Sequence, residues 1–210
     1  MEERKENAPI LEAKNLCFSY GDHKVLENVN FSVQPGEHVG LIGPSGCGKS
    51  TLVRLLAGYL RPQAGEILWG GKPLPRKGFC PVQMIHQHPE KAVNPMWKLR
   101  RILNESWRPD PEFLARVGIE EAWLNRYPIE LSGGELQRFC IARAMGPQTR
   151  CIIADEMTTM LDVITQAQIW ELMIREARQR DLSLLVVTHS PELARRICTR
   201  VVHFEELSGS

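Results

Sequence analysis

The sequence lacks the patterns that mark several classes of protein. Its six cysteines form no C-x-x-C pair, so neither a zinc site nor a disulfide framework is indicated. No apolar run approaches the length that spans a bilayer. The formal net charge is only +1, which gives no reason to expect nucleic acid or an anionic membrane as a partner. Residues 1–7 are polar and lack the apolar core of a secretory signal, so we expect a cytoplasmic protein.

What the sequence does contain is a phosphate-binding loop. The pattern G-x-x-x-x-G-K-[S/T], with one further threonine, is matched by Gly43, Pro44, Ser45, Gly46, Cys47, Gly48, Lys49, Ser50 and Thr51. The N–H groups of such a loop cradle a phosphate, and the helix that begins near Lys49 directs its positive end at the same place. We therefore expect Lys49 to reach the β- and γ-phosphates of a nucleotide and the Ser50 hydroxyl to hold Mg²⁺.

The order of strand and helix patterns predicts the fold class. Buried strands are expected over 39–42, 82–85, 151–154 and 184–187, and a last strand over 200–204. Helical patterns begin near residue 49 and cover 163–179 and 191–198. The longest of them offers Ile164, Ile169, Leu172, Met173 and Ile174 for a core face. Strands that alternate with helices imply a mostly parallel sheet, at whose carboxyl edge ligands bind.

Two further regions add to this core. Strands over 10–20 and 25–33, with a hairpin strand at 65–69, predict a small antiparallel sheet. Residues 88–146 are punctuated by prolines and contain helical pieces at 98–107 and 111–117, and another that ends near Met145. We expect one domain over 1–210: an α/β P-loop NTPase core (1–87 and 147–210) with an antiparallel β subdomain and an inserted α-helical lobe (88–146).

Two acids follow an apolar strand downstream of the phosphate loop. Asp155 is expected in the Mg²⁺ shell, and Glu156 is expected to orient and deprotonate the attacking water. Successive residues of an extended strand point to opposite faces, but the chain can bend at a strand end and bring both carboxylates near the γ-phosphate.

With five further motifs in order, the chain resembles the ATP-binding subunit of an ABC transporter over nearly its whole length. The five motifs are the adenine-stacking aromatic Tyr20, the Q-loop Gln87, the signature Leu131-Ser132-Gly133-Gly134-Glu135, the D-loop Met160-Leu161-Asp162 and the switch His189. Many relatives have proline after the catalytic glutamate, where this chain has Met157. No catalytic group is missing, but proline fixes φ, and its loss bears on the stiffness of the D-loop.

The resemblance implies a nucleotide-sandwich dimer with ATP and Mg²⁺. Each ATP lies between Lys49 and Ser50 of one subunit and Ser132 and Gly134 of the other. The resemblance places Gln87 near the metal and gives His189 a catalytic role. The implied partners are a second ABC ATPase subunit, identical or different, polytopic membrane permease subunits and an extracytoplasmic substrate-binding protein. The subunit then lies at the cytoplasmic face of the membrane.

Finer features are similar to the peptide and nickel importer subgroup, namely Asn94-Pro95, Tyr127-Pro128, Leu161-Asp162-Val163 and Gln166-Ala167-Gln168-Ile169. The other interpretations are a soluble ABC ATPase that acts on nucleic acid or ribosomes, and a P-loop kinase or GTPase. Soluble ABC ATPases of that kind usually have long coiled-coil insertions or two cassettes in one chain. A sequence of 210 residues without a heptad run fits neither description. A GTPase needs an Asn-Lys-x-Asp motif, which is absent, and a kinase needs no signature.

Two local questions stay open at this stage. The first is whether His86 and His88, which flank Gln87, could bind a metal ion, although two ligands alone rarely make a metal site. The apolar residues Ala92, Val93, Pro95, Met96 and Trp97 form either the lobe's own small core or a surface for a helix of a membrane subunit.

Overall fold

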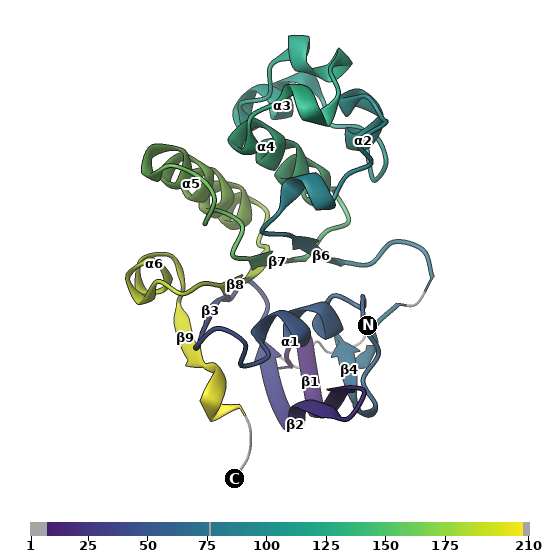
Figure 1. Cartoon of the computed structure of the whole chain (residues 1–210), viewed down its shortest axis with the longest axis vertical. Coiled ribbons are helices and arrows are strands. Elements are labelled where there is room, and N and C mark those ends of the chain that lie inside the picture. Colours follow the sequence, from purple (N-terminus) through teal and green to yellow (C-terminus); the bar gives the residue numbers. More distant parts are fainter. Residues whose placement is uncertain (1–7, 76, 208–210) are drawn as a thin grey trace, which may run out of the picture.

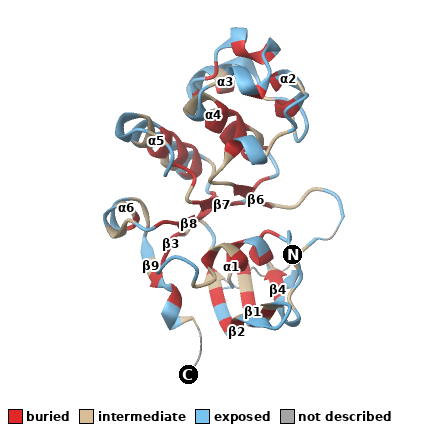
Figure 2. Ribbon diagram, in the orientation of Figure 1, coloured by how far each residue is buried: buried red, intermediate tan, exposed pale blue. Residues whose placement is uncertain are grey.

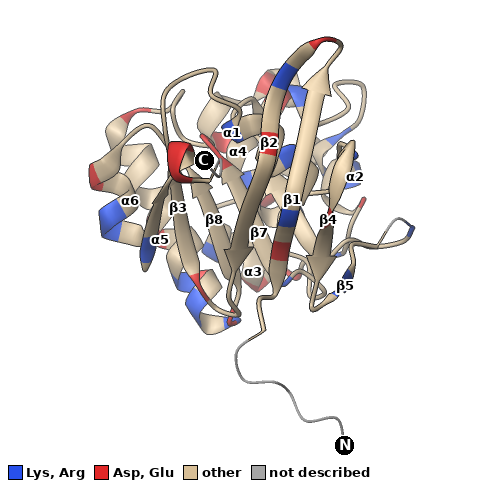
Figure 3. Cartoon of the chain, turned by 90° about the horizontal axis from the view of Figure 1, so that it is seen from below, with Lys and Arg blue, Asp and Glu red and all other residues tan. Residues whose placement is uncertain are grey.

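The structure is a computed structural model that describes residues 8–75 and 77–207. Two β-sheets lie one above the other (Figure 1). The helices α2 (Leu99–Leu103), α3 (Pro111–Val117) and α4 (Gly133–Ala144) lie together on the other side of the central sheet (Figure 1). Charges of both signs are spread over the face that Figure 3 presents, in agreement with the small net charge. The polar start that favours a cytoplasmic protein, residues 1–7, lies outside the described residues.

The central sheet has five strands in the order β6-β7-β8-β3-β9, and every neighbouring pair is parallel. Its strands are β3 (His38–Ile42), β6 (Val82–Ile85), β7 (Cys151–Asp155), β8 (Ser183–Val187) and β9 (Arg200–His203). Every residue of β3, β7 and β8 is buried, because helices or the second sheet cover both faces. The predicted α/β fold with a mostly parallel sheet is confirmed.

The second sheet is antiparallel and runs in the order β2-β1-β4-β5. Its strands are β1 (Leu11–Tyr20), β2 (His23–Val33), β4 (Ala64–Trp69) and β5 (Lys72–Pro73). The turn between β1 and β2 contains Gly21 at φ 56°, a conformation that glycine adopts at low cost. One face of this sheet packs on α1 (Lys49–Leu56), which buries Leu52, Leu55 and Leu56 in a core shared by both sheets (Figure 2).

The far face of the central sheet is covered by α5 (Val163–Gln179) and by the short helices of the predicted lobe. These helices are η1 (Pro89–Lys91), α2 (Leu99–Leu103), α3 (Pro111–Val117), η2 (Glu121–Asn125), η3 (Pro128–Glu130) and α4 (Gly133–Ala144). They share one apolar core with α5 and with the β7 residues Ile152 and Ala154. The limits of the lobe as an inserted unit, 88 and 146, stay a prediction.

Three sequence expectations need correction. The helix expected over 98–107 ends at Leu103, and the following residues turn so that the Trp107 indole donates to the Ala142 carbonyl at 2.9 Å. Ile164, expected in the core, is 72% exposed, because the buried side of α5 begins at Ile169. The last strand ends at His203 instead of 204, and a 3-10 turn η4 (Phe204–Glu206) follows. The short helix α6 (Pro191–Ile197) agrees with its prediction to within one residue.

Candidate active site

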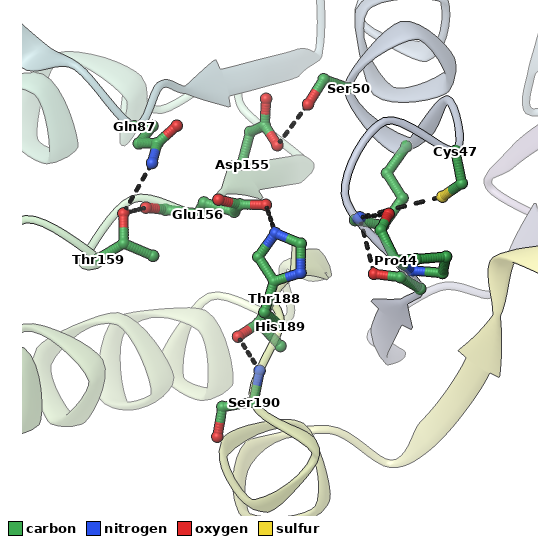
Figure 4. Close-up of polar contacts among 12 residues, drawn as sticks. Pro44, Cys47, Ser50, Gln87, Asp155, Glu156, Thr159, Thr188, His189 and Ser190 are labelled. Carbon is green, nitrogen blue, oxygen red and sulfur yellow. Dashed lines mark hydrogen bonds and ion pairs between the residues drawn. The ribbon is translucent and has the colours of Figure 1, made fainter. Parts of the chain in front are cut away.

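The predicted nucleotide-binding residues meet at the carboxyl edge of the central sheet. The phosphate loop follows β3, Gln87 follows β6, Asp155 ends β7 and His189 follows β8. Because these strands are parallel, their carboxyl ends lie at one edge of the sheet. Figure 4 shows the side chains that turn toward one another there. The sheet order therefore assembles four separate sequence motifs into one site.

The phosphate loop is shaped by its glycines. Gly46 and Gly48 have φ of 78° and 115°, and a Cβ at Gly48 would lie 2.9 Å from the Phe204 ring and 3.0 Å from Val25. A Cβ at Gly46 would meet nothing within 4 Å, so this part of the loop faces open space. The loop leads directly into α1, whose N-terminus adds unpaired N–H groups and a positive dipole end. The segment is thus built to receive an anion.

Lys49 is nearly buried at the start of α1. Its ammonium donates to the carbonyl oxygens of Gly43 at 2.9 Å and Pro44 at 2.7 Å, and it lies 4.0 Å from the Cys47 sulfur. An ammonium has three donors. Two donate to carbonyl oxygens of the loop, which fixes the position of the charge, and the third is directed at the Cys47 sulfur, a weak acceptor that a phosphate oxygen could replace.

Ser50 and Asp155 form the pair expected to hold Mg²⁺. The Ser50 hydroxyl donates to Asp155 Oδ1 at 3.4 Å, across 105 positions of sequence (Figure 4). Burial, followed by the charge of Glu156, raises the pKa of Asp155 above its ordinary value, while Arg54, Ser50 and Lys49 act in the opposite direction. A hydroxyl and a carboxylate are hard oxygen ligands, which is the donor set that Mg²⁺ prefers. These residues therefore fit the ion.

Glu156 stands at a sharp bend directly after β7. Its φ is 50°, an uncommon value for a residue with a side chain, and its N–H donates to the Val187 carbonyl at 3.1 Å. A bend is thus present at the strand end where one was expected, and the approach of both carboxylates to a γ-phosphate stays a prediction. The Glu156 carboxylate then lies 2.6 Å from His189 Nε2. Met157, in place of the proline of many relatives, is buried in the lobe-side core.

Gln87 contacts the loop after β7 directly. Its side-chain amide donates to Thr159 Oγ1 at 3.0 Å (Figure 4). The backbone one residue earlier, at His86, accepts a hydrogen bond from the buried Gln137 of α4 at 3.4 Å. No motif in the sequence points to Thr159 or Gln137. The only sequence signal for Thr159 is a hydroxyl three positions after Glu156, and the sequence pattern does not show which neighbour that hydroxyl faces.

The signature residues lie at the start of α4. Ser132 and Glu135 form a capping box: Glu135 N donates to Ser132 Oγ at 3.3 Å, and Ser132 N donates to the Glu135 carboxylate at 2.7 Å. A Cβ at Gly134 would lie 3.0 Å from Thr165 of α5, whereas at Gly133 it would meet only Leu161, at 3.8 Å. Within the described chain, no hydrogen bond joins the signature to the phosphate loop.

Asp162 and Tyr20 lie at the margins of the site. Asp162 caps α5 by accepting from Ile164 N at 3.1 Å and Thr165 N at 3.0 Å, and its hydrogen bond with the Thr165 hydroxyl lowers its pKa. Tyr20 is 49% exposed, and its ring lies nearly perpendicular to the Phe18 ring, with 4.9 Å between ring centroids. An exposed aromatic face is what stacking on a base requires.

The His86 and His88 side chains contact different neighbours. The His86 ring packs against Tyr59 with 5.6 Å between centroids, whereas His88 Nδ1 lies 3.2 Å from Glu90. Burial, followed by the charges of Arg54 and Arg143, lowers the pKa of His86. Among residues 8–75 and 77–207, no group of three or more His, Cys, Asp or Glu side chains is placed to hold a metal ion.

Comparison with known proteins relates this geometry to one family. Residues 26–159 match the family model described as ABC transporter. The nickel import ATP-binding protein NikE of Escherichia coli (strain K12) is 39% identical over 197 residues, which cover 85% of this chain and 74% of that protein. The same protein of Shigella dysenteriae serotype 1 gives the same values. These relatives are transport proteins, which favours a transporter subunit over a soluble ATPase that acts on nucleic acid.

Solved structures share the fold. A dimeric bacterial ABC transporter cassette, MJ0796, matches with a TM-score of 0.76 and 26% identity over 92% of this chain and 93% of that chain. The same cassette was solved as a dimer in a post-hydrolysis state bound to ADP and Pi. The cbiO1 protein of Clostridium perfringens, at 23% identity and a TM-score of 0.77 over 94% of this chain and 85% of that chain, supports the fold alone. In the described part of our chain, no helix is long and apolar enough to cross a membrane.

Proposed function

Because the chain belongs to the ABC transporter family as an ATP-binding subunit, we propose that it powers import of a peptide- or nickel-class cargo through membrane subunits. It is an ATPase, and its ligand is ATP. The import direction and the cargo class are supported by the relatives named as nickel import proteins and by the subgroup motifs at Asn94-Pro95 and Tyr127-Pro128. The cargo itself is selected by the membrane subunits and by an extracytoplasmic substrate-binding protein.

The observation that carries the proposal is the position of the Glu156–His189 pair beside the Ser50–Asp155 pair. Glu156 accepts the proton of the attacking water, and His189 holds the carboxylate in place for it. The Lys49 ammonium binds the β- and γ-phosphate oxygens, with the donor that now faces the weak acceptor Cys47 Sγ as the first to become available. Positioning and charge stabilisation of this kind supply most of the catalysis in phosphoryl transfer.

Ser50, Asp155 and the Gln87 carbonyl oxygen are the residues that would hold Mg²⁺. When bound, the ion neutralises negative charge on the β- and γ-phosphates. Asp155, whose pKa is raised by burial, would be ionised beside a bound cation, because a cation favours the carboxylate.

The signature takes its role from a second cassette, either another copy or a different chain. Ser132 and Gly134 of one subunit would close over the nucleotide bound to Lys49 of the other. α4 would then direct its N-terminus at the γ-phosphate. The lack of a hydrogen bond between the signature and the phosphate loop within one described chain supports such an arrangement. The subunit would lie at the cytoplasmic face of the membrane, attached through permease subunits.

The test compares two substitutions in the purified chain. Glu156→Gln keeps the shape of the side chain and removes the base, so we expect turnover to fall by about 10²–10⁴-fold while MgATP still binds. The same variant should sediment as a monomer without nucleotide and as a dimer with MgATP, because ligand held between subunits stabilises the closed pair. Lys49→Ala should instead weaken nucleotide binding and leave the chain monomeric in both conditions.

Undiminished hydrolysis by Glu156→Gln would refute the assignment of the base. Identical sedimentation with and without MgATP would count against a dimer of this chain with itself. Addition of a second cassette that co-purifies with the permease would then show whether the partner is a different chain.

A further inference from the structure

One hydroxyl group links Gln87 to the backbone of Glu156. Thr159 Oγ1 accepts a hydrogen bond from the Gln87 side-chain amide at 3.0 Å and donates one to the Glu156 carbonyl oxygen at 3.0 Å (Figure 4). A threonine hydroxyl has a single proton. Since that proton is directed at the Glu156 carbonyl, only the oxygen lone pairs of Thr159 face Gln87.

We propose that Thr159 is a positioning residue, whose hydroxyl fixes the orientation of the Gln87 amide and reinforces the bend at Glu156. The inference rests on the proposed function, because it assigns a role to a neighbour of the residues placed there in catalysis. Thr159 itself has no part in the chemical step, and it acts through the two residues that its hydroxyl joins.

The first effect concerns which atom of Gln87 faces the metal position. The two ends of an amide differ, since the nitrogen only donates and the oxygen only accepts. The lone pairs of Thr159 select the nitrogen end, so the Gln87 oxygen points away from Thr159 (Figure 4). A carbonyl oxygen is the end that Mg²⁺ can bind. Without the hydroxyl, nothing at position 159 distinguishes the two orientations of the amide.

The second effect concerns the strained backbone of Glu156. A φ of 50° is uncommon in a residue with a side chain and persists only where the surroundings hold it. The bend is held by the bond from Glu156 N to the Val187 carbonyl and by the bond from Thr159 N to the Glu156 carbonyl at 3.2 Å. The Thr159 hydroxyl adds a second donor to that same carbonyl oxygen. It therefore supports the turn that directs the Glu156 carboxylate to His189.

The neighbouring threonine shows the contrast between an anchor and a positioning residue. Thr158 is buried and its hydroxyl accepts from the Trp170 indole at 3.1 Å, which fastens the loop to α5. Thr159 is exposed and turns to Gln87. Because Thr159 is exposed, we expect its replacement to leave the chain folded, so effects on the site can be measured in a folded protein.

The experiment replaces the hydroxyl with a methyl group of the same shape. Thr159→Val in the full chain removes both hydrogen bonds of the hydroxyl and should lower kcat by at least about 2- to 13-fold, the range expected for the net loss of one of them, with little change in KM for ATP. The Mg²⁺ concentration for half-maximal rate should rise. Thr159→Ser, which keeps the hydroxyl, should restore both values. Thr199→Val is the matched control, since Thr199 also donates its hydroxyl proton to a carbonyl, that of His38 at 2.9 Å, but at the opposite edge of the sheet.

A second readout needs neither ATP nor metal. In the ¹⁵N-labelled chain, the Gln87 side-chain NH₂ signals are identified by their loss in Gln87→Ala. They should report a restrained amide in wild type and in Thr159→Ser, and a mobile one in Thr159→Val. In addition, Thr159→Val should have a smaller effect on kcat in the Gln87→Ala background than in wild type, because coupled residues are not additive. Should Thr159→Val not fold, Thr159→Ala gives the same comparisons.

The inference is overturned if Thr159→Val has the same kcat, the same Mg²⁺ dependence and the same Gln87 signals as wild type. It is also overturned if the effects of Thr159→Val and Gln87→Ala on kcat are fully additive in free energy. This failure is distinct from failure of the proposed function. If Glu156→Gln is inactive while Thr159→Val behaves as wild type, only the role of Thr159 is wrong. If Glu156→Gln retains turnover, the proposed catalytic assignment is wrong whatever Thr159 does.

Discussion

His189 Nε2 lies 2.6 Å from Glu156 Oε1, although the two residues follow different strands. The carboxylate comes from the bend after β7, and the ring comes from the segment after β8, where Ser190 N donates to the Thr188 hydroxyl at 3.1 Å. β7 and β8 are adjacent in the sheet, so their carboxyl ends place the two side chains together. The histidine thus restrains a carboxylate that stands on a strained backbone.

This contact predicts the effect of removing the ring. His189→Ala should lower kcat by about 10²-fold, because the Glu156 carboxylate loses its partner while the phosphate loop is untouched. MgATP binding should stay near the wild-type value, as measured by calorimetry. The double variant with Glu156→Gln should be no slower than Glu156→Gln alone, since either substitution disables the same Glu156–His189 pair. Independent, multiplying effects of the two substitutions would argue against the pair.

The apolar cluster after Gln87 can be divided by exposure. Trp97 packs partly buried against the lobe core, with the Arg101 guanidinium 3.7 Å above its ring, whereas Met96 is 79% exposed. We expect Trp97→Ala to destabilise the chain, by less than the ~3–5 kcal/mol of a fully buried tryptophan. Met96→Glu should leave the Tm unchanged and weaken co-purification with the permease. If Met96→Glu binds the permease normally, the contact surface lies elsewhere.

A buried histidine far from the site predicts how stability depends on pH. Burial, followed by the charge of Arg178, lowers the pKa of His38, while hydrogen bonds to the carbonyls of Ile197 and Leu182 raise it. The unfolded chain, with a histidine pKa of about 6.5, therefore takes up this proton first as the pH falls. The free energy of unfolding should decrease as the pH drops from about 6.5 toward the lower folded value.

Thermal unfolding across this range is the measurement. His38→Asn should reduce the loss of Tm on acidification, whatever it does to the Tm at neutral pH. His203→Asn, at an exposed position at the end of β9, serves as the control and should follow the wild-type curve. A wild-type slope in His38→Asn would assign the acid sensitivity to other groups, of which His86 is the next to test, since its pKa is also lowered.

The sequence by itself determined the strands, the long helix and the position of each motif along the chain. Uninterrupted apolar runs such as 151–154 predict buried parallel strands, because both faces of such a strand must be covered. The phosphate loop is equally local, since its glycines and the helix that follows act through consecutive N–H groups. Patterns of this kind depend on neighbouring residues and are readable without the fold.

The tertiary structure decided which motifs meet and how. Ser50 and Asp155 are 105 positions apart and contact only because the strands before them belong to one sheet. Periodicity places Ile164 on a helix but does not give the rotation of its first turn, which leaves that side chain exposed. Likewise, no local pattern shows that Thr159 turns to Gln87 while Thr158 turns to Trp170. These choices follow from packing between distant segments, which short-range propensity does not contain.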